Sequence, residues 1–461
     1  MPQRSSAQML WQRQATAPTG KRRQSGIALL AIMALLILVG LYLFIKGLNA
    51  SQLNRLRLEN GAASMEEGRQ ALIAEALSPT SIGDAGFLPL PDRGVTLVGS
   101  SWVASEGIAS QNFSGNAKDR SVIGKYPWGS LRSGALRDAG GDCLWYVVSG
   151  RFKSTPRTDA LNWDTAGQLD VIDANGNPVA TNLAALVIAP GIPLSAQDRN
   201  TSNVVYRECA GNYDARQYLD PPVVTQAIGG QFNYFPGGDT VAPDTGNKTF
   251  VLANNAGYND RLIFIHPDDI FNRLIKRSDF AGVIRTMLDY FKAQNDTIKL
   301  QNDAITLNNQ LKTAQNTVNA SLGLPLVPLD PLLPRTIIAG DKGTDNLGCP
   351  AEDASNIYDP LPSFCKNWKE MLFLTELPTP AYLMIDGAPS VDLCSRVLIF
   401  GGRKTTSQTR LTAADKTNKN NYLESPNNIS FAVPIASSST FTGTAFFNLN
   451  NPSADLIRCL L

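Results

Sequence analysis

The chain has very little histidine: His266 is the only one among its 461 residues. Histidine is the side chain best suited to acid–base work near neutral pH, so a single copy limits acid–base and nucleophilic schemes. His266 stands between Ile265 and Pro267 at the end of an apolar run, which favours a structural role. The sequence also lacks GxSxG, P-loop and HExxH motifs, and no GxGxxG precedes a helix. We therefore predict no enzyme activity, no catalytic residue and no cofactor.

Patterns that bind metal ions are also scarce. No CxxC pair occurs, which argues against a zinc site. Asp268-Asp269 follows a proline, so it is better interpreted as a helix N-cap than as a pair of catalytic acids. Residues 173–177 resemble the start of a calcium loop but lack the downstream glutamate, so we expect a hairpin turn at Asn175-Gly176. We predict no metal site.

Acidic residues are missing from the first 45 positions. Because the whole chain has a formal net charge of +1, the part after this basic start is mildly acidic. Nucleic-acid binding needs a clustered basic face, so we expect no nucleic-acid partner. The positive flank predicts that the N-terminus stays in the cytoplasm while the rest is translocated. The basic residues of this flank are Arg4, Arg13, Lys21, Arg22 and Arg23.

Charge is absent altogether from Ile27 to Ile45. As a helix this stretch would be about 29 Å long, enough to cross the hydrocarbon core of a bilayer. A cleaved secretory signal would have a shorter apolar part and a small-residue exit, whereas Lys46-Gly47 follows here. We predict a single pass through an inner membrane, with the body in the periplasm. The span is marked by Ile27, Leu30, Leu36, Leu41 and Ile45.

Proline is missing between this span and Pro79. One helix of roughly 50 residues, about 75 Å long, could therefore run from the membrane into the aqueous phase. Gly61 and Gly68 weaken its middle by about 1 kcal/mol each relative to alanine. Towards its end, apolar residues recur at helical spacing and predict a packed face. These residues are Leu72, Ile73, Ala76 and Leu77.

Six cysteines follow the span, and their even number fits disulfides formed in an oxidising periplasm. Six cysteines allow many connectivities, and the sequence leaves the choice open. We favour pairing between neighbours, because each pair then closes within one region of the chain. That pairing is Cys143 with Cys209, Cys349 with Cys365, and Cys394 with Cys459.

Beyond Pro79 short apolar runs alternate with turns, which predicts an α+β fold. We expect the long N-terminal transmembrane and amphipathic helix to pack on an antiparallel β-sheet, with additional helical and β-rich regions. Strands are predicted at 143–149, 184–190, 262–266 and 396–400, and a hairpin at 169–180. The expected regions are a leader (1–26), the long helix (27–78), an α+β region (79–275), a helical segment with a proline-rich linker (276–335) and a β-rich region (336–461).

A heptad-like apolar stripe lies in the helical segment, flanked mainly by Asn, Gln and Thr. Two interpretations remain open: the helix packs this edge on its own domain, or it forms an intermolecular coiled coil. The proline-rich stretch after Gly323 is linker-like. Further on, we expect 405–428 to be an exposed polar loop and 437–447 an edge strand. The stripe consists of Leu300, Ala304, Leu307, Leu311, Ala314 and Val318.

Residues 21–77 resemble type IV pilins and pseudopilins, in which a basic leader ends in glycine directly before an apolar span that continues as a long helix. The resemblance implies that a prepilin peptidase cuts between Gly26 and Ile27 and that Ile27 becomes N-methylated. The family usually begins with Phe and has Glu at the fifth mature position, where this chain has Ala31. A subunit without that acid is similar to the large minor pseudopilin at the tip of type II secretion pseudopili.

The resemblance implies a non-catalytic minor pilin or pseudopilin at or near the tip of a type IV pilus or secretion pseudopilus. Its partners would be other pilin or pseudopilin subunits, the prepilin peptidase and the inner membrane. After assembly the body could reach the cell surface, where residues 405–428 would be an adhesive contact. The alternative is a single-pass, membrane-anchored periplasmic binding protein, whose N-terminus would stay uncut.

Overall fold

The computed structural model shows a mixed α+β fold, as the sequence predicts, with one N-terminal apolar helix and several largely antiparallel sheets. Contacts divide the chain into an anchor unit, Met1–Arg57, and a body, Leu58–Leu461, which we describe separately. Described residues are 25–47, 50–98, 101–111, 119–157, 160–199, 208–209, 211–238, 240–241, 247–334, 348–352, 359–431 and 440–461.

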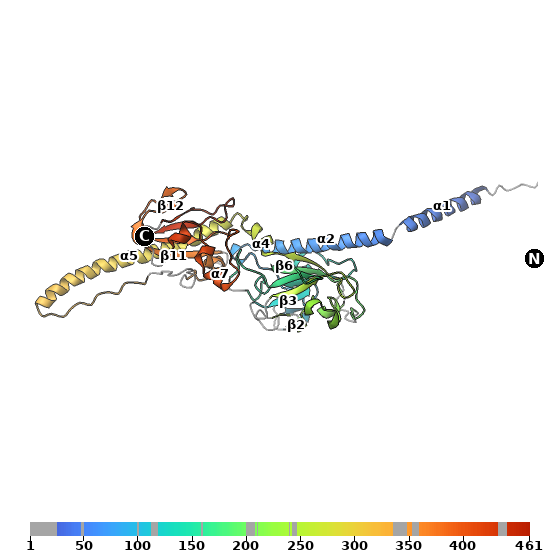
Figure 1. Cartoon of the computed structure of the whole chain (residues 1–461), viewed down its shortest axis with the longest axis horizontal. Helices are drawn as coiled ribbons and strands as arrows, with labels where there is room; N and C mark the ends of the chain where they lie inside the picture. Colours follow the sequence, from blue (N-terminus) through green and yellow to red (C-terminus); the bar gives the residue numbers. More distant parts are fainter. Residues whose placement is uncertain are drawn as a thin grey trace, which may run out of the picture. The chain divides into compact units, whose positions relative to one another are not determined.

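Among its described residues, this unit contains helix α1 (Ser25–Gly47) and the first residues of helix α2 (Ala50–Leu77) (Figure 1). Ala28–Gly47 has a mean hydropathy of 2.9, and none of it is buried within the structure. This confirms an apolar helix long enough to span a membrane. The predicted uninterrupted helix crosses Leu48 and Asn49, which lie outside the described residues.

A five-stranded antiparallel sheet is central to the first half of the body, with the order β10-β7-β4-β3-β8. The predicted strands at 143–149, 184–190 and 262–266 are confirmed as three adjacent strands of this sheet. Their uninterrupted apolar runs fit strands covered on both faces. The bounds are β3 (Ser121–Lys125), β4 (Trp145–Val148), β7 (Ala185–Ala189), β8 (Thr240–Val241) and β10 (Arg261–Ile265).

The C-terminal half of α2 belongs to the core on one side of this sheet. Its residues Leu72, Ile73 and Ala76 are fully buried in the same hydrophobic cluster as residues of β3, β4 and β7. Both helix glycines lie at close contacts: an added Cβ at Gly61 would stand 2.9 Å from the backbone N of Ala139, and one at Gly68 would touch Tyr126 and Leu136. The glycines therefore allow close packing, which offsets their low helix propensity.

Arginine side chains hold the end of α2 in place. Arg69 donates to the carbonyl oxygen of Phe264 at 2.9 Å and pairs with Asp269 at 3.0 Å. Asp269 also accepts a hydrogen bond from the backbone N–H of His266, at the start of helix α4 (Pro267–Leu274). Asp268 and Asp269 therefore lie in the first turn of α4, as the N-cap interpretation placed them at a helix start, but the N-cap residue itself is His266. Arg277 donates to the carbonyl oxygen of Leu77, where α2 ends.

A second core lies on the opposite face of the central sheet, where it includes Trp145, Val147 and Phe250. A three-stranded sheet of order β6-β5-β9 covers it, in which β5 pairs antiparallel with β6 and parallel with β9. The predicted hairpin is therefore confirmed, and the Asp173 carboxylate accepts hydrogen bonds from Asn175 and Asn177. The bounds are β5 (Leu169–Asp173), β6 (Pro178–Leu183) and β9 (Lys248–Leu252). Earlier in the chain, β1 (Val95–Val98) and β2 (Ser101–Ala104) pair antiparallel in a separate two-stranded sheet.

The C-terminal part of the body contains an antiparallel sheet of order β11-β14-β16 and a small mixed sheet of order β13-β12-β15. The strand predicted at 396–400 is β14. Of the predicted edge strand at 437–447, only Thr442–Gly443 is a strand, and 432–439 lie outside the described residues. The bounds are β11 (Leu372–Ala381), β12 (Met384–Ile385), β13 (Ala388–Pro389), β14 (Cys394–Phe400), β15 (Thr442–Gly443) and β16 (Leu456–Leu460).

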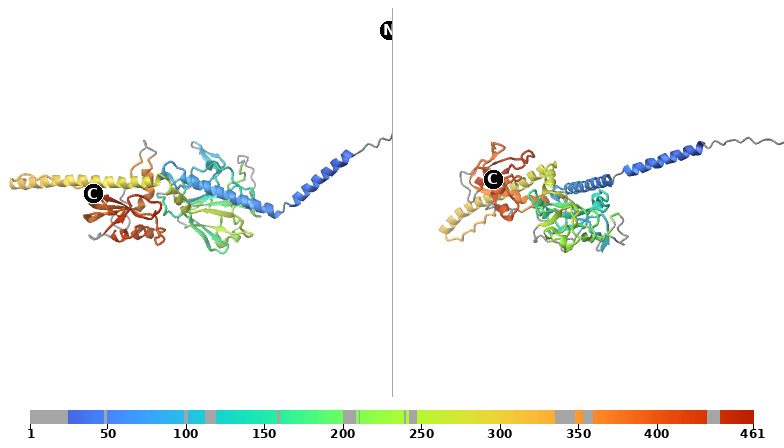
Figure 2. Two further views of the ribbon diagram at one scale, coloured as in Figure 1. Left: turned by 90° about the horizontal axis from the view of Figure 1, so that it is seen from above. Right: turned by 45° about the vertical axis from the view of Figure 1, so that its right-hand side comes forward.

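Helix α5 (Phe280–Ser321) unites the two helical stretches predicted in residues 276–335. One face of its first four turns is buried in the core, down to Asn295, whose side chain accepts a hydrogen bond from Arg396 of β14 at 2.9 Å. The helix then continues beyond the sheet (Figures 1 and 2). Shorter helices are α3 (Trp128–Leu131), α6 (Leu361–Trp368), α7 (Ala413–Thr417), α8 (Asn427–Ser430), η1 (Ile82–Asp84), η2 (Ala215–Gln217), η3 (Val224–Gln226), η4 (Ile228–Gly230), η6 (Lys369–Met371) and η7 (Lys419–Asn421).

Candidate functional sites

The apolar anchor is the first candidate surface. Gly26 and Ile27 fall in the first turn of α1, where the apolar span begins. The later marker residues of the span are more than half exposed, because no part of the described structure covers them. An exposed apolar helix of this length could cross the hydrocarbon core of a bilayer. These markers are Leu30, Leu36, Leu41 and Ile45.

All six cysteines form disulfides, in the neighbour pairing that we favoured: Cys143–Cys209, Cys349–Cys365 and Cys394–Cys459. The first pair closes 66 positions within the α+β half of the body, and the third connects β14 to β16 over 65 positions. Cross-links over such distances restrict the unfolded chain and so stabilise the fold.

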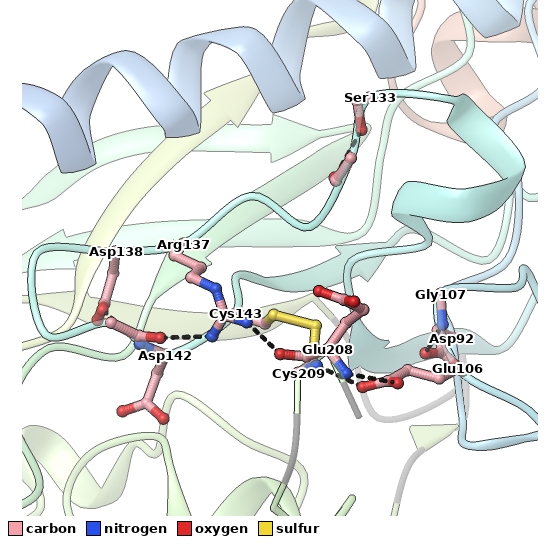
Figure 3. The surroundings of a disulfide bond; sticks show 12 residues. Asp92, Glu106, Gly107, Ser133, Arg137, Asp138, Asp142, Cys143, Glu208 and Cys209 are labelled. Carbon is pink, nitrogen blue, oxygen red and sulfur yellow. Dashed lines mark hydrogen bonds between the residues drawn. A yellow bond between two sulfur atoms is a disulfide. The ribbon is translucent and has the colours of Figure 1, made fainter. Parts of the chain in front are cut away.

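The surroundings of Cys143–Cys209 are polar but engaged with the backbone (Figure 3). The Glu106 carboxylate accepts hydrogen bonds from the backbone N–H groups of Glu208 and Cys209. Arg137 donates to the carbonyl oxygen of Glu208 from the other side. These charged groups therefore hold the disulfide-linked segment in place, which is a structural task.

A cavity of about 440 Å³ beside the central sheet is the second candidate site. Trp145, Tyr213 and Phe235 contribute aromatic walls, and Asp214 and Arg216 contribute charges. These two charges bind each other, through hydrogen bonds of 2.8 and 2.9 Å from the guanidinium to the carboxylate. Among the described residues that line the cavity there is no Ser, Thr, Cys, Lys or His side chain.

A buried lysine lies next to this cavity and was not singled out from the sequence. The Lys125 ammonium sits 4.6 Å from the ring centre of Tyr213 and 5.2 Å from that of Tyr218. Burial lowers the pKa of Lys125 to about 8, although the neighbouring Asp92 carboxylate favours the charged form. Burial raises the pKa of Asp92, which accepts hydrogen bonds from Tyr213 and two backbone N–H groups. A lysine inside one short strand gives no sequence signal of such a cluster.

Residues 405–428 are for the most part exposed or half-buried, as predicted, but they contain the short helices α7 and η7, and a few of their side chains are buried in the body. Arg410 is fully buried and forms an ion pair of 2.8 Å with the fully buried Asp164. Tyr422 and Leu423 are also buried, and Tyr422 stacks under the Arg410 guanidinium. The polar composition of this region gives no sign of these buried side chains. Through Arg410 they connect the C-terminal part of the body with Asp164 in its first half.

The described residues offer no cluster of three or more His, Cys, Asp or Glu side chains that could hold a metal ion. His266 is exposed and lies edge-on to Phe264, with 6.1 Å between ring centres. Comparisons with protein families, with curated proteins and with solved structures found no match to the chain. A function must therefore be inferred from its residues and their geometry.

Proposed function

We propose that the chain is a minor pilin-like or pseudopilin-like subunit, non-catalytic, that is anchored by α1 and assembles at or near the tip of a filament. The strongest support for this proposal is that the two N-terminal helices differ in how much of their apolar surface is covered. Helix α1 presents an uncovered apolar surface, whereas the C-terminal half of α2 is part of the core beside an antiparallel sheet. Such a helix can deliver a folded body to a filament whose centre is made of apolar helices.

The absence of acid from the span supports a position at a filament end. A carboxylate in an apolar environment is costly unless a positive group pairs with it. In the resembling family, Glu at the fifth mature position pairs with the N-terminal amine of a neighbouring subunit. Ala31 cannot make that pair, and the body of over 400 residues would crowd a regular lattice. A subunit at the tip needs neither this charge pair with a subunit above it nor a place in the regular lattice.

Processing of the N-terminus tests this proposal. We expect the membrane-extracted protein to begin at N-methylated Ile27 when a prepilin peptidase is co-expressed, and at Met1 without it. Gly26→Leu places a bulky side chain at the cleavage site and should abolish the shorter form, as seen by intact mass and N-terminal sequencing. Ser25→Ala is the matched control and should leave processing unchanged.

A protein that begins at Met1 with an active peptidase present would contradict the proposal. It would favour the second candidate, a single-pass, membrane-anchored binding protein with its body in the periplasm. The cavity lined by Trp145 and Tyr213 is the specific observation behind that candidate. Its aromatic walls and charged rim would suit a small polar ligand.

A further inference from the structure

The second part of α5 and the segment after it form a projecting arm, residues 296–334. Not one of these residues is buried, although the arm carries many apolar side chains. At Gly323, where φ is +67°, the chain reverses. The N–H groups of Gly323 and Leu324 bond back to the carbonyl oxygens of Ala320 and Asn319, a glycine-terminated helix end.

A repeated hydrogen-bond pattern holds the returning chain against the helix. Three asparagines of α5 are spaced by seven residues, and each forms two hydrogen bonds with one residue of the returning chain. The side-chain N–H of the asparagine donates to the backbone carbonyl oxygen of that residue, and the side-chain oxygen accepts from its backbone N–H. Those backbone partners are spaced by three. Seven helical residues advance about 10.5 Å and three residues of proline-rich extended chain about 9 Å, so the two repeats nearly match. The pairs are Asn302 with Leu333, Asn309 with Asp330, and Asn316 with Val327.

The apolar stripe lies on the other side of the helix. Each helical residue turns about 100°, so Leu300 points about 200° away from Asn302, and the same holds for Leu307 and Asn309. The interpretation in which the stripe packs on its own domain is therefore wrong. Its large residues are all more than half exposed: Leu300, Leu307, Leu311 and Val318.

We propose that this stripe binds the same stripe of a second copy of the chain, in an antiparallel helix pair centred on Asn309. Within the stripe, residue size is symmetrical about that position: large, small, large on one side and large, small, large on the other. An antiparallel pair with a twofold axis at Asn309 places Leu300 against Val318, Ala304 against Ala314, and Leu307 against Leu311 of the other copy.

Charge favours a second copy as the occupant. The edges of the stripe carry mainly Asn, Gln and Thr, and Asp303 pairs with Lys299 of its own helix. Amide side chains donate and accept, so a surface of this kind is complementary to itself. A strongly charged partner would leave its charges unpaired against these amides.

The body favours the antiparallel direction. It packs on the first turns of α5, where Arg458 of β16 bonds Asp289 at 2.9 Å and the backbone N–H of Leu461 bonds Asp296 at 2.8 Å. Parallel arms would bring two bodies together at one end of the pair, whereas antiparallel arms place them at opposite ends. Anchoring both copies in one membrane would raise their effective concentration and stabilise this short contact.

Disulfide cross-linking of the full chain in membranes tests the inference, because every native cysteine is already paired. We expect Leu300→Cys/Val318→Cys to form a linked dimer at a level at least severalfold above either single variant. The two positions are about 27 Å apart along one helix, so they cannot link within a chain. Val391→Cys, on a side chain that is 95% exposed, measures the background from random collisions.

Three results would overturn the inference. The double variant could link no better than Val391→Cys, or Leu300→Cys alone could link as well as the double variant, which would indicate parallel arms. Alternatively, Leu307→Asp/Leu311→Asp added to the double variant could leave the linked dimer unchanged, although it places charges inside the contact. The test does not depend on cleavage at Gly26, so its failure is separate from that of the proposed function.

Discussion

We expect Arg410→Met to lower the free energy of unfolding by about 3–5 kcal/mol, because it leaves a buried carboxyl group without its cation. Arg410 and Asp164 are both fully buried, and their charged atoms lie 2.8 Å apart. Arg410 also donates to the carbonyl oxygen of Gly402 at 3.0 Å, and its guanidinium lies 4.2 Å from the ring centre of Tyr422. Methionine fills much of the volume but replaces none of these polar contacts.

The measurement is guanidinium denaturation of the detergent-extracted full chain, with disulfides intact, followed by tryptophan fluorescence. Arg216→Met is the matched control, because Arg216 is 60% exposed and forms an ion pair with Asp214. An exposed pair contributes at most about 1 kcal/mol, so this control should barely change the midpoint. We expect Asp164→Asn/Arg410→Met to lose less than the two single losses combined, since the two positions interact directly.

If Arg410→Met behaves like the exposed control, the pair contributes little to the stability of the body. That result would return residues 405–428 to the group of independent surface loops, as composition suggested. The pair spans 246 positions, and neither side chain has a local partner pattern that would reveal it. Composition describes a stretch of sequence as a whole, so it cannot identify a single buried arginine within a polar stretch.

Strands and disulfides were predicted where local sequence is sufficient. The apolar runs that form β4, β7 and β10 are too long and too apolar to be turns, so the local sequence alone predicts strands there. Each neighbouring cysteine pair likewise closes within one region of the chain. The N-terminal helix glycines show the opposite case. Propensity counts Gly61 as a weakness, but its lack of a side chain is what lets the helix approach Ala139. Only the tertiary contact shows which effect is larger.

The arm shows what a periodic pattern leaves open. Heptad spacing identified the stripe from Leu300 to Val318, but the same spacing fits an edge packed on its own domain. The choice depends on where the chain goes after Gly323. Its prolines suggested a linker, whereas the structure shows the chain bonded to the asparagine face of α5, opposite the stripe. Side-chain hydrogen bonds to a returning backbone have no simple sequence signature.

We expect Asp455→Asn to flatten the dependence of stability on pH between about 4 and 7. Asp455 is 2% exposed, just before β16. Its Oδ2 accepts hydrogen bonds from the backbone N–H of Glu424 at 2.9 Å and from the Asn427 side chain at 2.7 Å. Burial raises the pKa of Asp455 from 3.8 to about 7, and the Glu424 charge acts in the same direction. The folded protein therefore holds a proton that the unfolded chain releases.

The sign follows from this difference in bound protons. A carboxyl group whose pKa is raised by folding stabilises the fold fully at pH values below its unfolded pKa of 3.8. That stabilisation is lost as the pH rises towards 7, and on the order of 4 kcal/mol is at stake, because one pKa unit corresponds to about 1.4 kcal/mol. Burial also raises the pKa values of Asp220 and Asp260, so the wild-type protein should lose stability over this range through several groups.

Unfolding free energies of the wild type and Asp455→Asn, measured every half unit from pH 4.5 to 8, isolate the contribution of this one carboxyl group. The variant should be relatively more stable above pH 7, where the wild type must either keep a buried charge or unfold. Asp173→Asn is the control, because hydrogen bonds from Asn177 lower the pKa of that exposed carboxylate, so its titration ends below the range. Parallel pH profiles for the wild type and Asp455→Asn would show that Asp455 is already ionised in the folded protein at pH 5, against the expectation from its burial.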